Sequence, residues 1–117
     1  MKRKGIFTLI ICIIILTAMT ACRGADSPST VVRQLITAIE NGDTAAINNL
    51  MTPDSADIIL LFLEKIQGVF LEQGGITNME EIISGGTAVV TVTFQNGARE
   101  EYDLVLENRR WLVTINK

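Results

Sequence analysis

The sequence contains no histidine, and this absence excludes several kinds of chemistry at once. Ser-His-Asp and Cys-His catalysis both need an imidazole as the base, and histidine is also the commonest metal ligand in proteins. A glycine-rich phosphate loop is lacking too, because Gly74-Gly75 and Gly85-Gly86 are isolated pairs of the kind found in turns. We therefore expect this chain to hold no metal and no cofactor.

Cysteine and positive charge are also scarce. The two cysteines, Cys12 and Cys22, both lie near the N-terminus, so the rest of the chain must be held together by packing rather than by a disulfide. The chain has 10 basic and 13 acidic residues, and its only adjacent cations beyond the N-terminus are Arg109-Arg110. Because nucleic-acid binding needs a basic surface, we do not expect nucleic acid as a partner.

The first residues are unlike the rest of the chain. Three cations at residues 2–4 precede an apolar run over residues 5–18, which is shorter than the ~20 residues that a bilayer-spanning helix needs. A positive start, a short apolar run and a small-residue cleavage site are together typical of a secretory signal peptide. Here the small residues lead directly into a cysteine, in the sequence Met19-Thr20-Ala21-Cys22.

This sequence resembles the lipobox of bacterial lipoproteins, although Met19 stands where leucine is commonest. The resemblance implies a signal peptide over residues 1–21, diacylglyceryl transfer to the sulfur of Cys22, and a tether over residues 22–26. It also implies attachment to the bacterial cell membrane or outer membrane, with the domain at residues 27–117 outside the cytoplasm. The alternative is an uncleaved anchor helix that contains a cysteine by chance. Cleavage would leave 96 residues with a formal net charge of −6, since Lys2, Arg3 and Lys4 would be removed.

The residues after the tether have the pattern of helices. Ser27 is a suitable N-cap, Pro28 suits the first helical position, and Gly42 can close the helix in a left-handed conformation. The apolar side chains within this first helix fall on one face: Val32, Leu35, Ile36 and Ile39.

Two further helices are expected. A short one starts at Asp43, and Thr52-Pro53 opens a long one that continues to Gln73. Residues 58–63 of this long helix are apolar on every side, so we expect it to be covered from more than one direction.

From Ile76 onward the apolar residues recur with a period of two, which predicts strands over residues 76–84, 87–94, 99–107 and 111–116. Asn96-Gly97 predicts a hairpin with a type I′ turn, and another turn is expected near Asn108-Arg109. Helices followed by a four-stranded antiparallel meander predict an α+β domain with three helices on one face of the sheet.

The order of these elements resembles the small bacterial lipoprotein domains of unknown function that are related to nuclear transport factor two, the cystatin-like cone fold. The resemblance covers residues 27–115, and it depends on the helix end at "NGD", the helix start at "TP", the hairpin "TVTFQNG" and the last strand "RRWLVTI". It implies a curved sheet wrapped around the helices, with a pocket between them in many members. The family includes ketosteroid isomerases and many non-enzymes, so the fold alone cannot select an activity.

Few residues suggest a site. Four aromatic residues are candidates for lining a cone cavity, with plain core packing as the alternative: Phe62, Phe70, Tyr102 and Trp111. Glu100 and Glu101 are strand neighbours, so their side chains point to opposite faces and cannot act together as an acid–base pair. A buried carboxylate within hydrogen-bond reach of Tyr102 would favour an enzyme.

The sequence therefore predicts a lipid-anchored, non-catalytic domain of the cell envelope that binds a small apolar ligand or a protein partner. Two alternatives stay open. One is a minimal enzyme of the ketosteroid-isomerase kind. The other is a structural module that pairs with itself as a homodimer or with another envelope protein.

The lipoprotein hypothesis makes a direct prediction about Cys22. The substitution Cys22→Ala removes the sulfur that would carry the lipid, so the precursor is expected to stay unlipidated and uncleaved at this site. Mass spectrometry of the full-length gene product, extracted from its own membrane, measures both changes. Unchanged processing of the variant would contradict the hypothesis.

Overall fold

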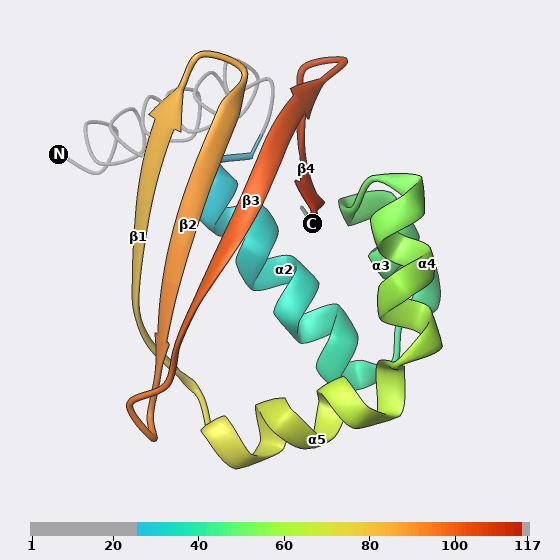
Figure 1. Cartoon of the computed structure of the whole chain (residues 1–117), viewed down its shortest axis with the longest axis vertical. Coiled ribbons are helices and arrows are strands. Elements are labelled where there is room, and N and C mark those ends of the chain that lie inside the picture. The colour runs from blue at the N-terminus through green and yellow to red at the C-terminus, as the bar shows by residue number, and fades with distance from the viewer. Residues whose placement is uncertain (1–25, 116–117) are drawn as a thin grey trace, which may run out of the picture.

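A computed structural model describes residues 26–115, and element labels follow Figure 1. The helices are α2 (Pro28–Asn41), α3 (Thr44–Leu50), α4 (Pro53–Leu61) and α5 (Leu63–Gln73). The strands are β1 (Ile76–Ser84), β2 (Thr87–Phe94), β3 (Arg99–Glu107) and β4 (Arg110–Thr114). The assignments of a signal peptide and of lipid on Cys22 lie outside the described residues. Within residues 26–115, no helix is both long enough and apolar enough to cross a bilayer.

The first helix begins and ends at the predicted residues, and the second begins at the predicted cap. The Ser27 hydroxyl accepts a hydrogen bond from the Thr30 backbone N–H, and Gly42 closes α2 with a φ of 68°. The Asp43 carboxylate then accepts from the backbone N–H of Ala46 and so caps α3. These side chains satisfy N–H groups that have no partner inside a helix.

The predicted single long helix is wrong, because the chain divides it at Phe62 into α4 and α5. Phe62 leaves the helical conformation, with a φ of −111° and a ψ of 24°. The division allows α5 to turn from the lower end of α4 towards the lower end of the sheet, as Figure 1 shows, and to bury Phe70. The expectation that residues 58–63 are covered from more than one direction is wrong, because Leu61 is 76 % and Phe62 50 % exposed at the junction of the two helices.

The sheet is an antiparallel meander in the order β1-β2-β3-β4, as predicted. The type I′ turn is not at Asn96-Gly97, because that geometry needs a positive φ at both residues and only Gly97 has one. The Asn96 side chain instead accepts from the backbone N–H of Ala98 within a longer loop. Positive φ values at Asn108 and Arg109, of 52° and 65°, give the tight turn between β3 and β4.

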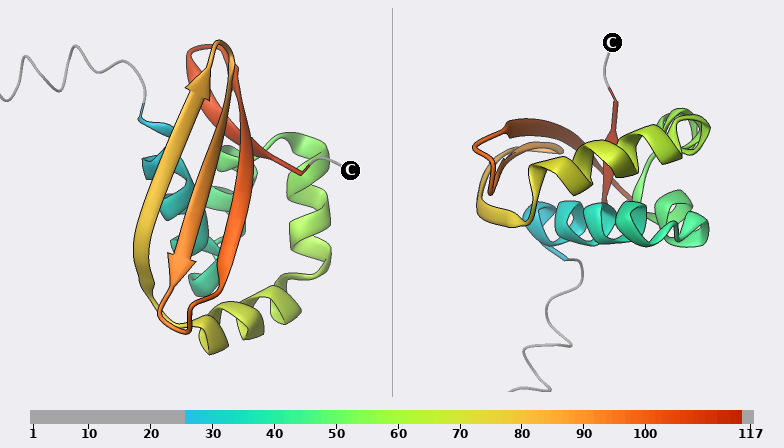
Figure 2. Two further views of the ribbon diagram at one scale, coloured as in Figure 1. Left: turned by 60° about the vertical axis from the view of Figure 1, so that its left-hand side comes forward. Right: turned by 90° about the horizontal axis from the view of Figure 1, so that it is seen from below.

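The core lies between α2 and the concave face of the sheet, as Figure 2 shows. The α2 face predicted from the sequence is confirmed, since Val32, Leu35, Ile36 and Ile39 are all 2 % exposed or less. The sheet contributes a matching set of buried side chains: Ala88, Val90, Val92, Phe94, Leu104 and Val113. The predicted α+β class and the helices on one face of the sheet are therefore confirmed.

Strand β4 is too short to cover the whole length of β3. Strand β4 pairs with β3 only from Asp103 to Glu107, so residues 99–102 of β3 have no neighbouring strand on that side within the described chain. Helices α4 and α5 lie beyond this open edge of β3, with α4 at the right of Figure 1 and α5 along the bottom. The space they enclose with α2 and β3 is where the candidate site is found.

Candidate functional site

A cavity of about 370 Å³ lies between the sheet and the helices. Its helical walls are apolar and comprise Leu35 and Ile39 of α2, Ile59 of α4, and Ile66, Val69 and Phe70 of α5, with Met51 before α4. Residues 100–103 of β3 and 113–115 at the end of β4 form the opposite wall. Val69 is 41 % exposed, so the cavity opens to solvent beside α5.

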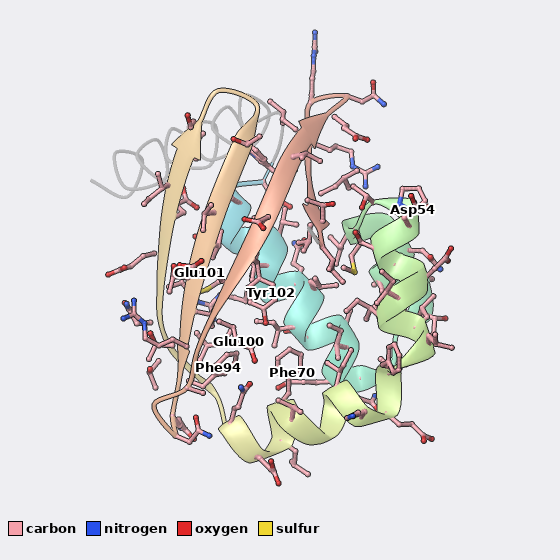
Figure 3. The ribbon with its side chains drawn as sticks, viewed as in Figure 1. Asp54, Phe70, Phe94, Glu100, Glu101 and Tyr102 are labelled. Carbon is pink, nitrogen blue, oxygen red and sulfur yellow. The ribbon has the colours of Figure 1, made fainter. Side chains whose placement is uncertain are left out.

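The polar centre of the cavity is a pair of side chains on β3. Glu100 and Tyr102 are two residues apart, so they project from the same face of the strand. The Tyr102 hydroxyl donates a hydrogen bond of 2.5 Å to Oε1 of Glu100. On the other side, Nε2 of Gln73 donates a bond of 2.8 Å to Oε2 of the same carboxylate. Figure 3 shows Glu100 and Tyr102 beside Phe70, on the side of β3 that faces the helices.

Gln73 is itself buried at the C-terminal end of α5, and its Oε1 atom has no hydrogen-bond partner.

Gly74, the residue after α5, directs the chain towards β1. Gly74 has a φ of 80° and a ψ of −166°, a conformation that is almost confined to glycine. A Cβ at this position would lie 2.7 Å from the Gln95 side chain. Glycine at position 74 therefore allows the chain to leave α5 and enter β1 while Gln73 stays next to Glu100.

Tyr102 is held as a neutral phenol. Burial raises its pKa far above the ordinary value of 10.0, and the hydrogen bond to Glu100 and the negative charge of that carboxylate raise it further. All three effects disfavour the phenolate. The hydroxyl therefore remains a donor throughout the pH range in which proteins normally work.

A group of hydroxyls fixes the end of the cavity near β4. Thr52 donates to the Ser55 hydroxyl over 2.8 Å, and the backbone N–H of Ile115 donates to the same hydroxyl over 2.8 Å. The Thr52 N–H also bonds to the carbonyl of Val113. These bonds tie the start of α4 to the end of β4, which keeps the two sides of the cavity at a fixed separation.

The four aromatic candidates separate into two groups. Phe70 and Tyr102 line the cavity, and Phe70 also stacks at a tilt on Phe94, with ring centroids 5.8 Å apart. Phe62 is half exposed at the junction of α4 and α5, and Trp111 packs against the core from β4. Neither of these two is among the lining residues.

Sequence reasoning missed Glu100 as a partner of Tyr102. The expectation that Glu100 and Glu101 point to opposite faces agrees with the structure, where Glu101 is exposed and Glu100 is partly buried. The same period of two places Glu100, Tyr102 and Leu104 on one face, and this signal would have found the pair. Within residues 26–115, no group of three or more acidic or cysteine side chains is arranged to hold a metal.

Comparison with solved structures identifies the architecture. A Campylobacter jejuni protein, provisionally named an NTF2-like transpeptidase, superposes with a TM-score of 0.57 over 78 % of this chain and 100 % of its own. The chain has the NTF2-like cone fold. Sequence identity to that protein is 18 %, so the likeness concerns the fold alone. No family model matches the sequence, and no curated protein is significantly similar to it.

The buried Tyr102–Glu100 bond makes a prediction that a titration can measure. Tyr102 is the one tyrosine in the sequence, so tyrosinate absorbance in the near ultraviolet reports this residue alone. In the folded protein we expect no tyrosinate near pH ~10, whereas the urea-unfolded chain should titrate there.

The raised pKa also links Tyr102 to stability. Because the neutral form is favoured in the folded state, its contribution is complete below the unfolded pKa of ~10 and is lost as the pH rises above it. Urea unfolding should therefore show a stability that falls more steeply above this pH in the wild type than in Tyr102→Phe. A folded-state titration near pH ~10 would contradict the buried hydrogen bond.

Proposed function

We propose that this domain binds a small, mainly apolar molecule in the cone cavity and does not transform it. The observation that carries the proposal is the cavity itself, which is open to solvent and has apolar walls from three helices. Ligand sites in proteins are typically clefts of about 300–1,000 Å³ with mostly apolar linings and a few polar groups. This cavity is within that range.

We further propose that lipid on Cys22 attaches the domain to the envelope of a bacterial cell. The sequence Met19-Thr20-Ala21-Cys22 and the preceding cationic and apolar segments support this part of the proposal. The short distance in sequence between Cys22 and the start of α2 at Pro28 would hold the domain close to the membrane surface. A molecule taken up there would come from the membrane or from the space beside it.

The name of the Campylobacter protein raises the question of peptidyl transfer. Such a reaction needs an activated nucleophile, in most cases a serine or cysteine beside a base. The one hydroxyl side chain that lines the cavity, apart from the tyrosine, is Thr114, and its side-chain contacts are with the hydroxyls of Thr52 and Ser55 rather than with a base. The residues of this cavity therefore support binding better than transfer.

One observation favours a second candidate function, proton transfer within a bound ketone. Glu100 is a partly buried carboxylate within hydrogen-bond distance of Tyr102, the arrangement that would favour an enzyme. However, isomerases of this kind keep the base and the hydrogen-bond donors on opposite sides of the substrate. Here both side chains come from β3 and bond to each other, and the wall opposite them is apolar. Binding therefore remains the first proposal.

A protein partner or a homodimer is supported less well. The most exposed large apolar side chains are Leu61 and Leu71 on α4 and α5, and Ile82 on β1. These elements lie on opposite sides of the molecule in Figure 1. Phe62 beside Leu61 and Ile83 beside Ile82 are also about half exposed. Because these side chains are divided between opposite sides of the molecule, they do not form the single contiguous patch that marks an interface.

Substitutions on α5 test ligand binding. Val69→Trp places a large ring at the cavity opening and should reduce the fraction of ligand-bound protein at least tenfold. Leu71→Trp is the matched control, because Leu71 is on the same helix, is 84 % exposed and does not line the cavity. Native mass spectrometry of the full-length proteins, extracted gently from their own membrane, measures the bound mass. Equal loading of both variants, or no bound molecule in the wild type, would contradict the proposal.

The second candidate makes a separate prediction. If the cavity carries out proton transfer, a cyclic ketone incubated with the protein in heavy water would gain deuterium beside its carbonyl, and Glu100→Gln would abolish the gain. We expect no exchange above the rate of the buffer, because the Glu100 carboxylate is already bonded to Tyr102 and Gln73. Nuclear magnetic resonance of the ketone measures the exchange. Catalysed exchange that depends on Glu100 would replace binding with enzymatic function.

A further inference from the structure

The cavity contains a carboxylate without a positively charged neighbour. The side-chain hydrogen bonds of Glu100 come from Tyr102 and Gln73, and both donors are neutral groups. Among the described residues that line the cavity, none is a lysine or an arginine. A partly buried negative charge is ordinarily paired with a cation, since removal from water disfavours it.

The carboxylate is also held in place rather than left free to turn to solvent. One oxygen is fixed by the Tyr102 hydroxyl from the same strand, and the other by the buried Gln73 amide from α5. A carboxylate has about four acceptor positions, so two bonds leave it able to accept more. Gln73 itself is not among the residues that line the cavity, so it holds the carboxylate from behind. The free acceptor positions of Glu100 are therefore the ones that a ligand in the cavity can use.

The rest of the cavity has the opposite character. Ile59, Ile66 and Val69 face it from α4 and α5, and Leu35 and Ile39 face it from α2. A molecule that fits both parts would place a positively charged donor at Glu100 and an apolar body against these side chains.

We propose that the ligand of this cavity is an apolar amine, bound as its ammonium ion with the charged nitrogen at Glu100. This inference rests on the proposed ligand-binding function and specifies the chemical class of the ligand. The ammonium supplies the missing positive charge and donates to the carboxylate, and the helices of the cone cover its apolar body. A neutral molecule of the same shape gains only the apolar contacts. An anionic one is repelled by Glu100.

The test uses three probes that differ mainly in their polar end: phenylbutylammonium, phenylbutanol and phenylbutyrate. Calorimetric titration of the full-length protein in lipid nanodiscs, with empty nanodiscs subtracted, measures their affinities. We expect the ammonium to bind about tenfold more tightly than the alcohol, because hydrogen bonds to a charged group are the stronger kind. The butyrate should bind most weakly. Shifts of the Ile66 methyl resonance locate each probe in the cavity.

Two variants separate the role of Glu100 from the general acidity of the protein. Glu100→Gln keeps the shape of the side chain and removes its charge, so the preference for the ammonium should fall to twofold or less. Glu107→Gln removes the same charge from an exposed position of β3 outside the cavity and should keep the preference. Circular dichroism of both variants checks that they are folded.

The other outcomes are distinguishable. If the alcohol binds in the cavity as tightly as the ammonium, the inference is wrong while the proposed function stands. A preference for the butyrate, or an ammonium preference that survives Glu100→Gln, also overturns the inference. If none of the probes shifts the Ile66 resonance, both the inference and the proposed small-molecule function lose their basis.

Discussion

The rest of the structure depends on the burial of α2 against the concave face of the sheet. The described chain contains no cysteine, so no disulfide can hold it, and a domain of this size has a small core. The core is centred on this contact, where side chains such as Val32, Val90 and Val92 are completely buried, and Ile47 of α3 and Ala56 of α4 extend it. Each apolar square ångström removed from water contributes roughly 25 cal/mol, which makes this contact the main source of stability.

Because most buried side chains lie against α2, the space between β3 and helices α4 and α5 is not filled, and it forms the cavity. Strand β4 stops before it covers residues 99–102 of β3, and α4 and α5 lie beyond this open edge and line the cavity from the other side. The division of the long helix at Phe62 produces this arrangement, because it turns α5 towards the lower end of the sheet. The same turn brings Gln73 to Glu100, so the shape of the cavity and its polar centre have a common origin.

Much of the fold could be predicted from local signals in the sequence. Ser27, Gly42 and Asp43 act through bonds and dihedral angles within a few residues, and the strands follow a simple period of two. The break at Phe62 could not be predicted, because a segment that is apolar on every side carries no periodic signal for where the helix ends. The I′ turn was misplaced because Asn96 uses its side chain to hold a longer loop, while Asn108 and Arg109 adopt the positive φ values.

The candidate site was only partly predictable, because one of its contacts joins residues that are distant in the sequence. Tyr102 and Phe70 were identified as aromatic residues on apolar faces, but aromatic character alone also selected Phe62 and Trp111, which lie outside the cavity. The pairing of Glu100 with Tyr102 follows from strand alternation and needed no long-range information. The contribution of Gln73 did need it, because Gln73 and Glu100 are 27 residues apart in the sequence and meet only through the path of α5.

The central claim is that the cone encloses a ligand cavity with Glu100 fixed at its polar end. A crystal structure of the full-length protein, purified from its own membrane without a stripping step, tests this claim most directly. The account predicts electron density in the cavity that does not belong to the chain, with one end within hydrogen-bond distance of the Glu100 carboxylate. A cavity filled by the chain's own side chains, with Glu100 turned out to solvent, would contradict it.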